Sequence, residues 1–246
     1  MPSQHYDLNR FALSDMFTCG AEIRQLGAGV SSMEEAAQAL VKLFYNRFRD
    51  DVGDPACALV RCFKTHEYGF LQPDLQKFAD AMSAGAVIHP STRCLTLLAT
   101  AGEQPDWNDR NKSIGHKAIP LLSPQMVSQA PMINQLIQQL GLDVAQVLSP
   151  DPSFLVDVNE KTFNVFHVPE APGSPFVPVQ SDFVLKYHVK SVLGFGGMLP
   201  NGDLFAVILF SKVFIPRETA DLFATLALGV KLALLPFVRG KVFAQA

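Results

Sequence analysis

The sequence predicts an α+β domain in which a largely antiparallel sheet is flanked by N-terminal and C-terminal helices. Three features lead to this prediction: a capped amphipathic helix near the N-terminus, an apolar hairpin around Asn201 and Gly202, and a long apolar helix after the hairpin. With 246 residues and 48% hydrophobic side chains, the chain can bury a sizeable core without disulfides or metal. We expect a helical extension over residues 1–30, a single domain over residues 31–238 and a tail over residues 239–246.

The N-terminal part predicts two helices. The first covers residues 10–26, where apolar side chains recur, and glycines follow it. The second begins after Ser32, because a serine followed three residues later by Glu35 forms a capping box. Apolar residues then recur at helical spacing as far as Phe48. The chain therefore enters the domain through helices.

Two strands and a helix are predicted in the next part of the chain. Residues 56–63 and residues 92–100 are short, apolar runs, which is typical of buried strands. Residues 72–82 predict a helix that starts behind Pro73. Residues 102–116 are polar and rich in turn-forming residues, so we expect a loop that leaves the sheet there.

The following segment predicts one helix, two strands and an irregular connection. Residues 131–140 open with proline and end before Gly141, as helices commonly do. Residues 154–158 and 162–168 have strand character. Residues 170–180 contain several prolines, which predicts an irregular connection at the surface.

The clearest local signal is a β-hairpin. Residues 191–199 and 204–211 are apolar, and Asn201-Gly202 lies between them. Asn-Gly favours a tight hairpin turn because both residues can adopt positive φ. A proline then opens a helix over residues 214–235.

The composition argues against several classes of protein. The formal net charge is -3, from 20 Lys and Arg against 23 Asp and Glu, which gives no basic footprint for nucleic acid. The N-terminal residues lack the apolar core of a signal peptide. A reduced, cytoplasmic protein that binds no nucleic acid is therefore expected. Too few cysteines are present for a disulfide framework: Cys19, Cys57, Cys62 and Cys94.

The C-terminal apolar stretch raises the question of a membrane. Residues 222–238 are about as apolar as a spanning segment but carry Lys231 at the centre, where a charge is costly in lipid. We expect a buried or interface helix and no membrane partner. Apolar residues lie all around this helix, so some of them should contact a second copy, which predicts a homodimer through the final helix. These residues are Leu222, Leu226, Leu228, Val230, Leu232 and Leu235.

The motifs of common catalytic and metal sites are not found. The glycines of GFGGML lead into a hairpin and not into a helix, so they do not form a phosphate loop. Cys57 and Cys62 are five residues apart in a predicted strand, which places them on opposite faces and predicts no shared metal. No nucleophile and base are brought together by the pattern, so no catalytic residue is predicted.

Aromatic residues and histidines near the predicted strands suggest a small-molecule pocket. Such pockets are concave and apolar, with few polar groups. The alternative is that the phenylalanines form ordinary core. Alternation along the strand places Phe166 and His167 on opposite faces, so we expect only one of them to line the pocket. The candidate ligand-binding residues are Phe166, His167, Tyr187, His188 and Phe195.

The C-terminal third resembles the closing hairpin and final helix of GAF domains. This stretch reads SVLGFGGMLPNGDLFAVILFSKVFIPRETADLFATLALGVKLALLPF. Leu204, Ala206 and Ile208 occupy the apolar strand, and Ile215, Ala220, Leu222, Phe223, Leu226 and Ala227 occupy the pattern at the start of the helix. The capped helix followed by ACALVRCF resembles the opening helix and first strand of the same family. Residues 64–150 are longer than in a minimal GAF domain, so the middle loops and helices are enlarged.

The resemblance implies a sensory module that binds a small organic molecule and dimerises through its first and last helices. Members of the family bind cyclic nucleotides, bilins or haem, and one branch reduces free methionine sulfoxide with closely arranged cysteines. No basic cluster for phosphate is evident in the sheet region, and the cofactor stays open. We therefore expect a non-enzymatic ligand-sensing or regulatory domain of a cytoplasmic signalling protein. The alternatives are a cysteine-dependent redox enzyme of the same fold and a ligand-free dimerisation scaffold.

Overall fold

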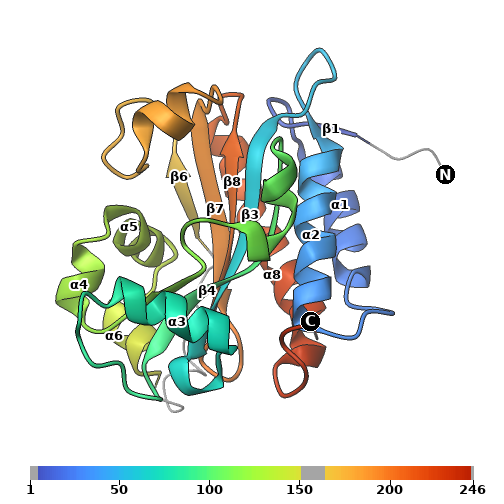
Figure 1. Cartoon of the computed structure of the whole chain (residues 1–246). Helices are drawn as coiled ribbons and strands as arrows, with labels where there is room; N and C mark the ends of the chain where they lie inside the picture. Colours follow the sequence, from blue (N-terminus) through green and yellow to red (C-terminus); the bar gives the residue numbers. More distant parts are fainter. Residues whose placement is uncertain (1–4, 151–163, 245–246) are drawn as a thin grey trace.

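The computed structural model describes residues 5–150 and 164–244. Its centre is a six-stranded sheet with the spatial order β5-β4-β3-β8-β7-β6, in which all neighbouring strands are antiparallel (Figure 1). The predicted α+β class is therefore confirmed. The strands are β3 (Cys57–Glu67), β4 (Arg93–Gly102), β5 (Ala118–Pro120), β6 (Val165–Val168), β7 (Ser191–Met198) and β8 (Leu204–Ser211).

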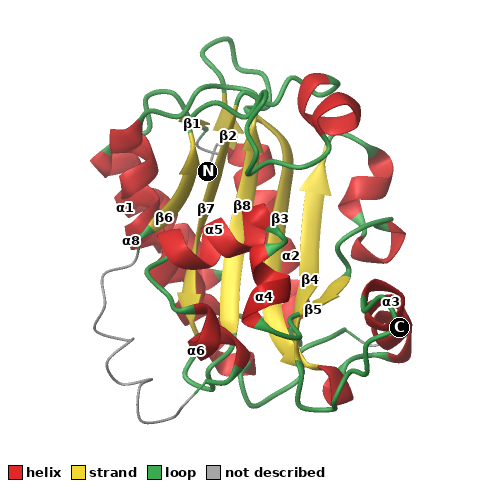
Figure 2. Ribbon diagram, turned by 90° about the vertical axis from the view of Figure 1, so that its left-hand side faces the viewer, coloured by secondary structure: helices red, strands yellow, loops and turns green. Residues whose placement is uncertain are grey.

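Helices cover both faces of the sheet. The helices from the two ends of the chain lie on one face, and the short helices from the middle of the chain lie on the other (Figures 1 and 2). The first group is α1 (Leu13–Gln25), α2 (Met33–Arg47) and α8 (Arg217–Leu234). The second group is α4 (Pro124–Ser128), α5 (Pro131–Gln139) and α6 (Val144–Leu148), while α3 (Pro73–Met82) packs beside β5 at the sheet edge.

Local signals in the sequence set two of these elements. Ser32 caps α2 by accepting a hydrogen bond from the backbone N–H of Glu35 at 3.2 Å. The hairpin of β7 and β8 pairs Met198 with Leu204 across the turn, where Gly202 has φ +81°. Gly196 permits close approach of the strands, because a Cβ there would lie 2.1 Å from a carbonyl oxygen of β8.

The face toward α1, α2 and α8 is called the helix-side face. Its core is apolar and aromatic, with ring centroids of neighbouring phenylalanines 5.2 to 6.4 Å apart. Phe195 lies in this core, in edge contact with Phe44 at 5.5 Å and near Phe223 at 5.4 Å. Aromatic pairs at these distances add to the stabilisation from burial.

The opposite face, here called the loop-side face, has a second core. Phe166 and Ile208 lie in it, below α4, α5 and α6. A loop between β4 and β5 crosses the sheet edge and contributes Trp107 to the same core. The loop contains the short helices η2 (Pro105–Asn108) and η3 (Arg110–Lys112). After β6, the proline-containing residues 170–180 form the expected irregular connection, and a turn of π-helix, η4 (Gln180–Leu185), begins at its last residue.

The two ends of the chain are tied to the domain. A short parallel pair, β1 (Tyr6–Asp7) with β2 (Phe48–Arg49), holds the N-terminal segment. At the other end, the backbone N–H groups of Met33 and Glu34 donate to Lys241 and Val242 carbonyls at 3.0 and 2.8 Å. The tail therefore covers the start of α2, close to the label C in Figure 1. The predicted strand 154–158 lies outside the described residues.

The predicted interface helix is buried along one face. Among the described residues, one helix, Arg217–Phe237, is long and apolar enough to cross a membrane by length and composition, and 44% of its apolar window is buried. Leu226 and Val230 face the helix-side core, and Leu228 and Leu232 are exposed. This arrangement is compatible with a soluble protein, and the cytoplasmic location stays a prediction.

Candidate functional site

The structure does not bring the five predicted site residues together. Phe166 and Tyr187 lie on the loop-side face, Phe195 is buried on the helix-side face, and His188 is exposed. The ring of His167 lies 3.0 Å from the carbonyl oxygen of Ile215, toward α8. Alternation along β6 thus separates Phe166 from His167, as expected.

The strand glycines leave space on the face opposite Phe195. That space at Gly194 is filled by protein, because a Cβ there would lie 3.0 Å from Leu136 and 3.1 Å from Phe166. Phe195 itself points to the helix-side core, since side chains of neighbouring strand residues point to opposite faces.

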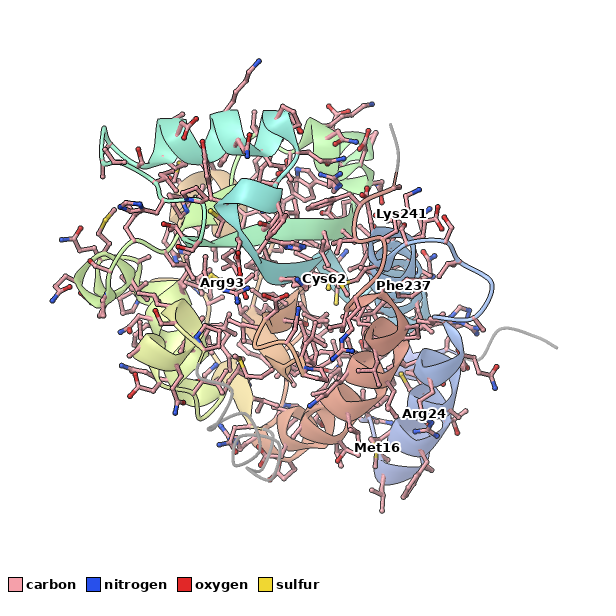
Figure 3. All side chains as sticks on the ribbon, turned by 90° about the horizontal axis from the view of Figure 1, so that it is seen from below. Met16, Arg24, Cys62, Arg93, Phe237 and Lys241 are labelled. Atoms are coloured by element: carbon pink, nitrogen blue, oxygen red, sulfur yellow. The ribbon has the colours of Figure 1, made fainter. Side chains whose placement is uncertain are left out.

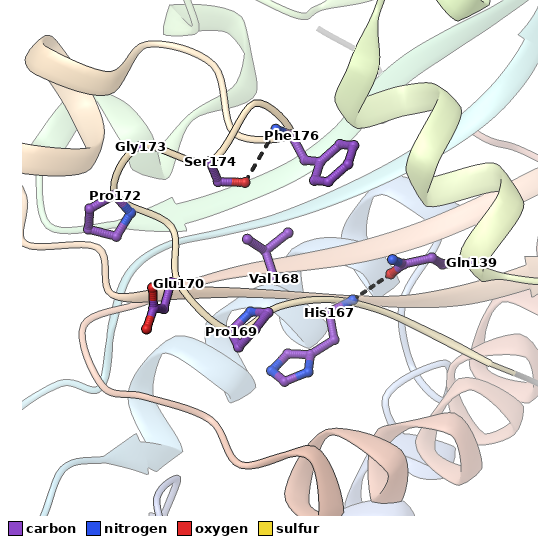
Figure 4. A pocket seen from close by; sticks show the side chains of 9 residues that line it. All are labelled: Gln139, His167, Val168, Pro169, Glu170, Pro172, Gly173, Ser174 and Phe176. Carbon is purple, nitrogen blue, oxygen red and sulfur yellow. Dashed lines mark hydrogen bonds between the residues drawn. The ribbon is translucent and has the colours of Figure 1, made fainter.

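A pocket of about 440 Å³ lies beside the end of β6 (Figure 4). Its polar groups are partly used by the surrounding backbone, since Gln139 accepts from the N–H of His167 at 2.8 Å and Ser174 accepts from the N–H of Phe176 at 3.3 Å. Partial burial lowers the pKa of His167, so its ring is neutral at pH 7. The pocket is lined by Gln139, His167, Val168, Pro169, Glu170, Pro172, Gly173, Ser174 and Phe176.

A more unusual group of residues lies in the middle of the sheet, around Arg61. Arg61 is directly opposite Thr100 of β4 and Ile208 of β8. Residues directly opposite each other in antiparallel strands share a face, and Ile208 belongs to the loop-side core. Arg61 and Thr100 are therefore two polar side chains on the loop-side face of an otherwise apolar region.

Arg61 is incompletely partnered. One terminal nitrogen donates to the hydroxyl of Ser113 at 3.3 Å, and the buried Nε makes no hydrogen bond within the described part of the chain. None of the ion pairs found there includes Arg61. Burial lowers the pKa of Arg61 to about 10, which still leaves the guanidinium charged at neutral pH.

Thr100 is the second polar group without a partner. It is 1% exposed, and its hydroxyl makes no hydrogen bond to the described residues. Its backbone carbonyl, by contrast, accepts a hydrogen bond from the side chain of Gln38 in α2 at 3.1 Å. Thr100 therefore connects the loop-side face to a terminal helix.

An aromatic cluster stands beside these polar groups. Trp107 lies against Gly102, where a Cβ would be 2.9 Å from its ring, and Gly102 is two residues from Thr100 on the same face. The ring centroids of Trp107 and Tyr187 are 4.6 Å apart, and Phe183 is 5.0 Å from Phe210. We call these four aromatic residues, Trp107, Phe183, Tyr187 and Phe210, the aromatic wall.

The loop between β4 and β5 supplies the rim of the site. It provides Trp107 and Ser113, whose hydroxyl donates to the carbonyl of Gly115 at 2.8 Å and so can accept from Arg61. His116 follows with φ 60° and is exposed at the rim. Partial desolvation and, second, the charge of Arg61 lower the pKa of His116.

The cations at the other end of β3 are paired with acids, although the buried Nδ1 of His66 beside them makes no hydrogen bond to the described residues. Lys64 and Arg93 both contact the carboxylate of Asp203, which is buried. His66 lies 3.3 Å from Lys64 and stacks on Phe243 of the C-terminal tail. This network joins strands and tail, and its charges compensate one another.

The cysteines have a different arrangement from the predicted one. Cys57 and Cys62 both lie in the helix-side core, because a register shift after Cys57 changes the alternation along β3. In Figure 3, Cys62 lies on the side of the sheet toward Phe237. Burial raises the pKa of each thiol to about 12. Within the described ranges, no group of three or more His, Cys, Asp or Glu residues could hold a metal.

Arg61 was missed by sequence reasoning, although a signal was present. It is the charged residue in the apolar run ALVRCF, where neighbouring strand residues are buried. Lys64 lies in the same strand but on the helix-side face, where it contacts Asp203, so the two cations do not form a basic cluster. A charge inside a central strand needs a partner, and only the three-dimensional arrangement shows whether the chain provides one.

Comparisons with known structures match this fold. No protein family profile matches the sequence, and no curated protein does. The chain is similar to a free methionine-R-sulfoxide reductase from Neisseria meningitidis solved with its substrate, at 10% identity, over 97% of this chain and 98% of that chain, with a TM-score of 0.51. It is also similar to the GAF domain of a phosphoenolpyruvate-protein phosphotransferase from Coxiella burnetii, at 11% identity, over 89% and 91% of the two chains, with a TM-score of 0.47. The protein has a GAF-like fold, as the C-terminal residues predicted.

Proposed function

We propose that the protein is a regulatory domain that binds a small organic molecule on the loop-side face of its sheet. The observation that carries this proposal is a pair of buried polar atoms, the Nε of Arg61 and the hydroxyl of Thr100, that make no hydrogen bond to the described residues. Buried polar atoms in folded proteins are nearly always hydrogen-bonded. A bound ligand would complete these hydrogen bonds.

The surroundings of the pair support a ligand site. Binding sites for small molecules are mostly apolar, with a few polar groups that orient the ligand. The aromatic wall supplies the apolar surface, and Arg61, Thr100 and Ser113 supply the polar groups. The thiols, in contrast, are buried away from this site, and burial keeps them protonated. Their arrangement therefore does not favour a reductase.

The output is proposed to pass through the terminal helices. Thr100 connects directly to α2 through Gln38, and α2 packs with α8 on the helix-side face. A ligand that holds β3 and β4 in one arrangement would favour one position of these helices. The size of the shift is limited by the difference in ligand affinity between the two arrangements.

We also propose that the domain is a homodimer through α8 and α1. Leu228 and Leu232 on α8 and Leu235 directly after it form an exposed apolar stripe, and Leu13 and Phe17 are exposed on α1. Apolar stripes of this kind are typical of helix interfaces. Light scattering should give a dimer mass, and Leu232→Glu should give a monomer, while a wild-type monomer across micromolar concentrations would contradict the dimer.

Native mass spectrometry tests the ligand-binding proposal. The protein, purified without denaturation, should carry a small molecule that denaturation releases. If no molecule is bound, hydrogen exchange in β3, β4 and α2 should slow when a metabolite mixture is added. Absence of both effects would favour the ligand-free scaffold.

A further inference from the structure

Arg61 is half-buried and differs in its partners from the buried cations Lys64 and Arg110. Lys64 contacts the carboxylate of Asp203, and Arg110 donates two hydrogen bonds to Glu34 at 2.7 and 3.0 Å. Each of these cations lies beside an acid from the same chain. Arg61 has no such acid, although removal of a charge from water is costly unless it is paired. The missing counter-charge points to an anion from outside the chain.

The free donors are of the kind that bind a carboxylate. The Nε of Arg61 is buried and unused, and the buried hydroxyl of Thr100 is unused on the directly opposite residue. Opposite residues in antiparallel strands have Cβ atoms about 5 Å apart. A carboxylate has two oxygens, and it matches the planar fork of a guanidinium better than other anions of one charge.

The charge of the site favours a monoanion. His116 is the basic residue whose pKa responds to Arg61, and the pKa is lowered, so its imidazole is neutral at pH 7. Arg61 then supplies a single positive charge. One carboxylate balances this charge, whereas a phosphate with nearly two charges would leave an excess in a partly buried site.

The aromatic wall determines the rest of the ligand. Trp107 is half-buried and reaches the sheet two residues from Thr100. Its neighbours Phe183 and Tyr187 present ring faces and edges at 4.6 to 5.9 Å from one another. Aromatic side chains at such spacing favour flat or apolar groups.

We propose, on the basis of the proposed function, that the loop-side site binds a small organic carboxylate. The carboxylate accepts hydrogen bonds from Arg61 and Thr100, and the apolar or aromatic part of the molecule lies against Trp107. Arg61 thereby determines the charge of the ligand, and the aromatic wall determines its shape.

Trp107 is the single tryptophan of the chain, so its fluorescence reports on this site directly. Acetate, phenylacetate and 3-phenylpropanoate are titrated into the protein, with phenylacetamide as the neutral counterpart of phenylacetate. We expect a saturable change of Trp107 emission with the aromatic acids, at least tenfold weaker apparent binding of acetate, and at least tenfold weaker binding of the amide.

Two variants separate a ligand-binding role of Arg61 from a structural one. Arg61→Met should weaken phenylacetate binding at least tenfold and leave the unliganded melting temperature unchanged or higher, because it removes an uncompensated charge. Thr100→Val keeps the shape and the guanidinium, so binding should weaken by a smaller factor. Arg217→Gln, which changes an exposed arginine of α8, is the matched control and should bind as wild type.

The outcomes distinguish this inference from the proposed function. Equal binding of phenylacetate and phenylacetamide, or undiminished binding to a folded Arg61→Met variant, would overturn the carboxylate site and leave a neutral ligand. No saturable response to any acid, with a neutral molecule found by native mass spectrometry, would do the same. No response and no bound molecule would overturn both, and water alone would then solvate Arg61.

Discussion

The two faces of the sheet are both well buried, but they differ in how their cations are paired. On the helix-side face, the charge of Lys64 is balanced by the carboxylate of Asp203 from the same chain. On the loop-side face, Arg61 and Thr100 keep unused donors beside an aromatic wall. Burial alone therefore does not mark a functional site. A functional site is indicated by a buried polar or charged group that lacks a partner, because such a group adds nothing to the stability of the folded chain.

The compensated network should show the largest effect when one partner is changed. Asp203→Asn keeps the shape of the side chain but leaves Lys64 buried without an acid and leaves Arg93 with Glu67 at 3.6 Å. We expect a loss of about 3 to 5 kcal/mol in the free energy of unfolding, measured by urea denaturation. Asp221→Asn, in an exposed pair with Arg217, is the control and should lose less than about 1 kcal/mol. Equal losses would show that burial adds nothing to the Asp203 network.

The thiols test the separation of the two faces. Replacement of all four cysteines by alanine removes packing from the helix-side core and from the edge near α3, and should lower the free energy of unfolding by a few kcal/mol, about 1 per site. Ligand binding at Trp107 should be unchanged, because none of the thiols lies in the loop-side core. Turnover of methionine sulfoxide that a single cysteine change abolishes would instead establish the redox enzyme.

A pH dependence should come from the compensated end of β3. Burial first, and then the charge of Lys64, lower the pKa of His66 well below its ordinary value, so the folded state holds this ring neutral. The unfolded ring takes up a proton below its reference pKa of about 6.5. Stability should therefore be complete above pH 6.5 and fall as the pH decreases toward the folded-state pKa, by at most about 1.4 kcal/mol per pH unit from this residue.

His66→Gln measures that contribution. Because the charges of Lys64, Arg93 and Arg110 and the ring of Phe243 surround His66, other groups nearby also shape the profile. The variant should show a shallower loss of stability between pH 7 and 5.5 in urea titrations. An unchanged slope would assign the dependence to His116 and His167, whose pKa values are lowered as well.

Much of the fold could be predicted from local signals in the sequence. Features that depend on contacts between distant residues could not. The cap at Ser32 and the hairpin at Asn201-Gly202 depend on a few neighbouring residues, so they were visible in the sequence. The faces of Cys57 and Cys62 depend on a bulge that shifts the register of β3 against β8, and period-two counting fails across it.

The candidate site was only partly visible for the same reason. Tyr187 was selected for its aromatic ring and does lie on the loop-side face, whereas Phe195 faces the terminal helices. Arg61 stands out in its strand only once its surroundings are known. Asp203, which compensates Lys64, is 139 residues away in sequence, and no spacing rule indicates which of the two cations of β3 it will meet.

The smallest expected effect is also the most direct test of the uncompensated face. Thr100→Val replaces a buried hydroxyl without a partner by a methyl group of the same shape, and Thr100 is 1% exposed. Because an unsatisfied buried hydroxyl is costly, the unliganded protein should be more stable by about 1 kcal/mol in urea denaturation, although most core substitutions destabilise. Thr96→Val is the matched control, since the Thr96 hydroxyl donates to the carbonyl of Cys94 at 3.1 Å and its loss should lower stability. If Thr100→Val is as destabilising as Thr96→Val, the Thr100 hydroxyl is compensated in solution, and the contrast between the two faces rests on Arg61 alone.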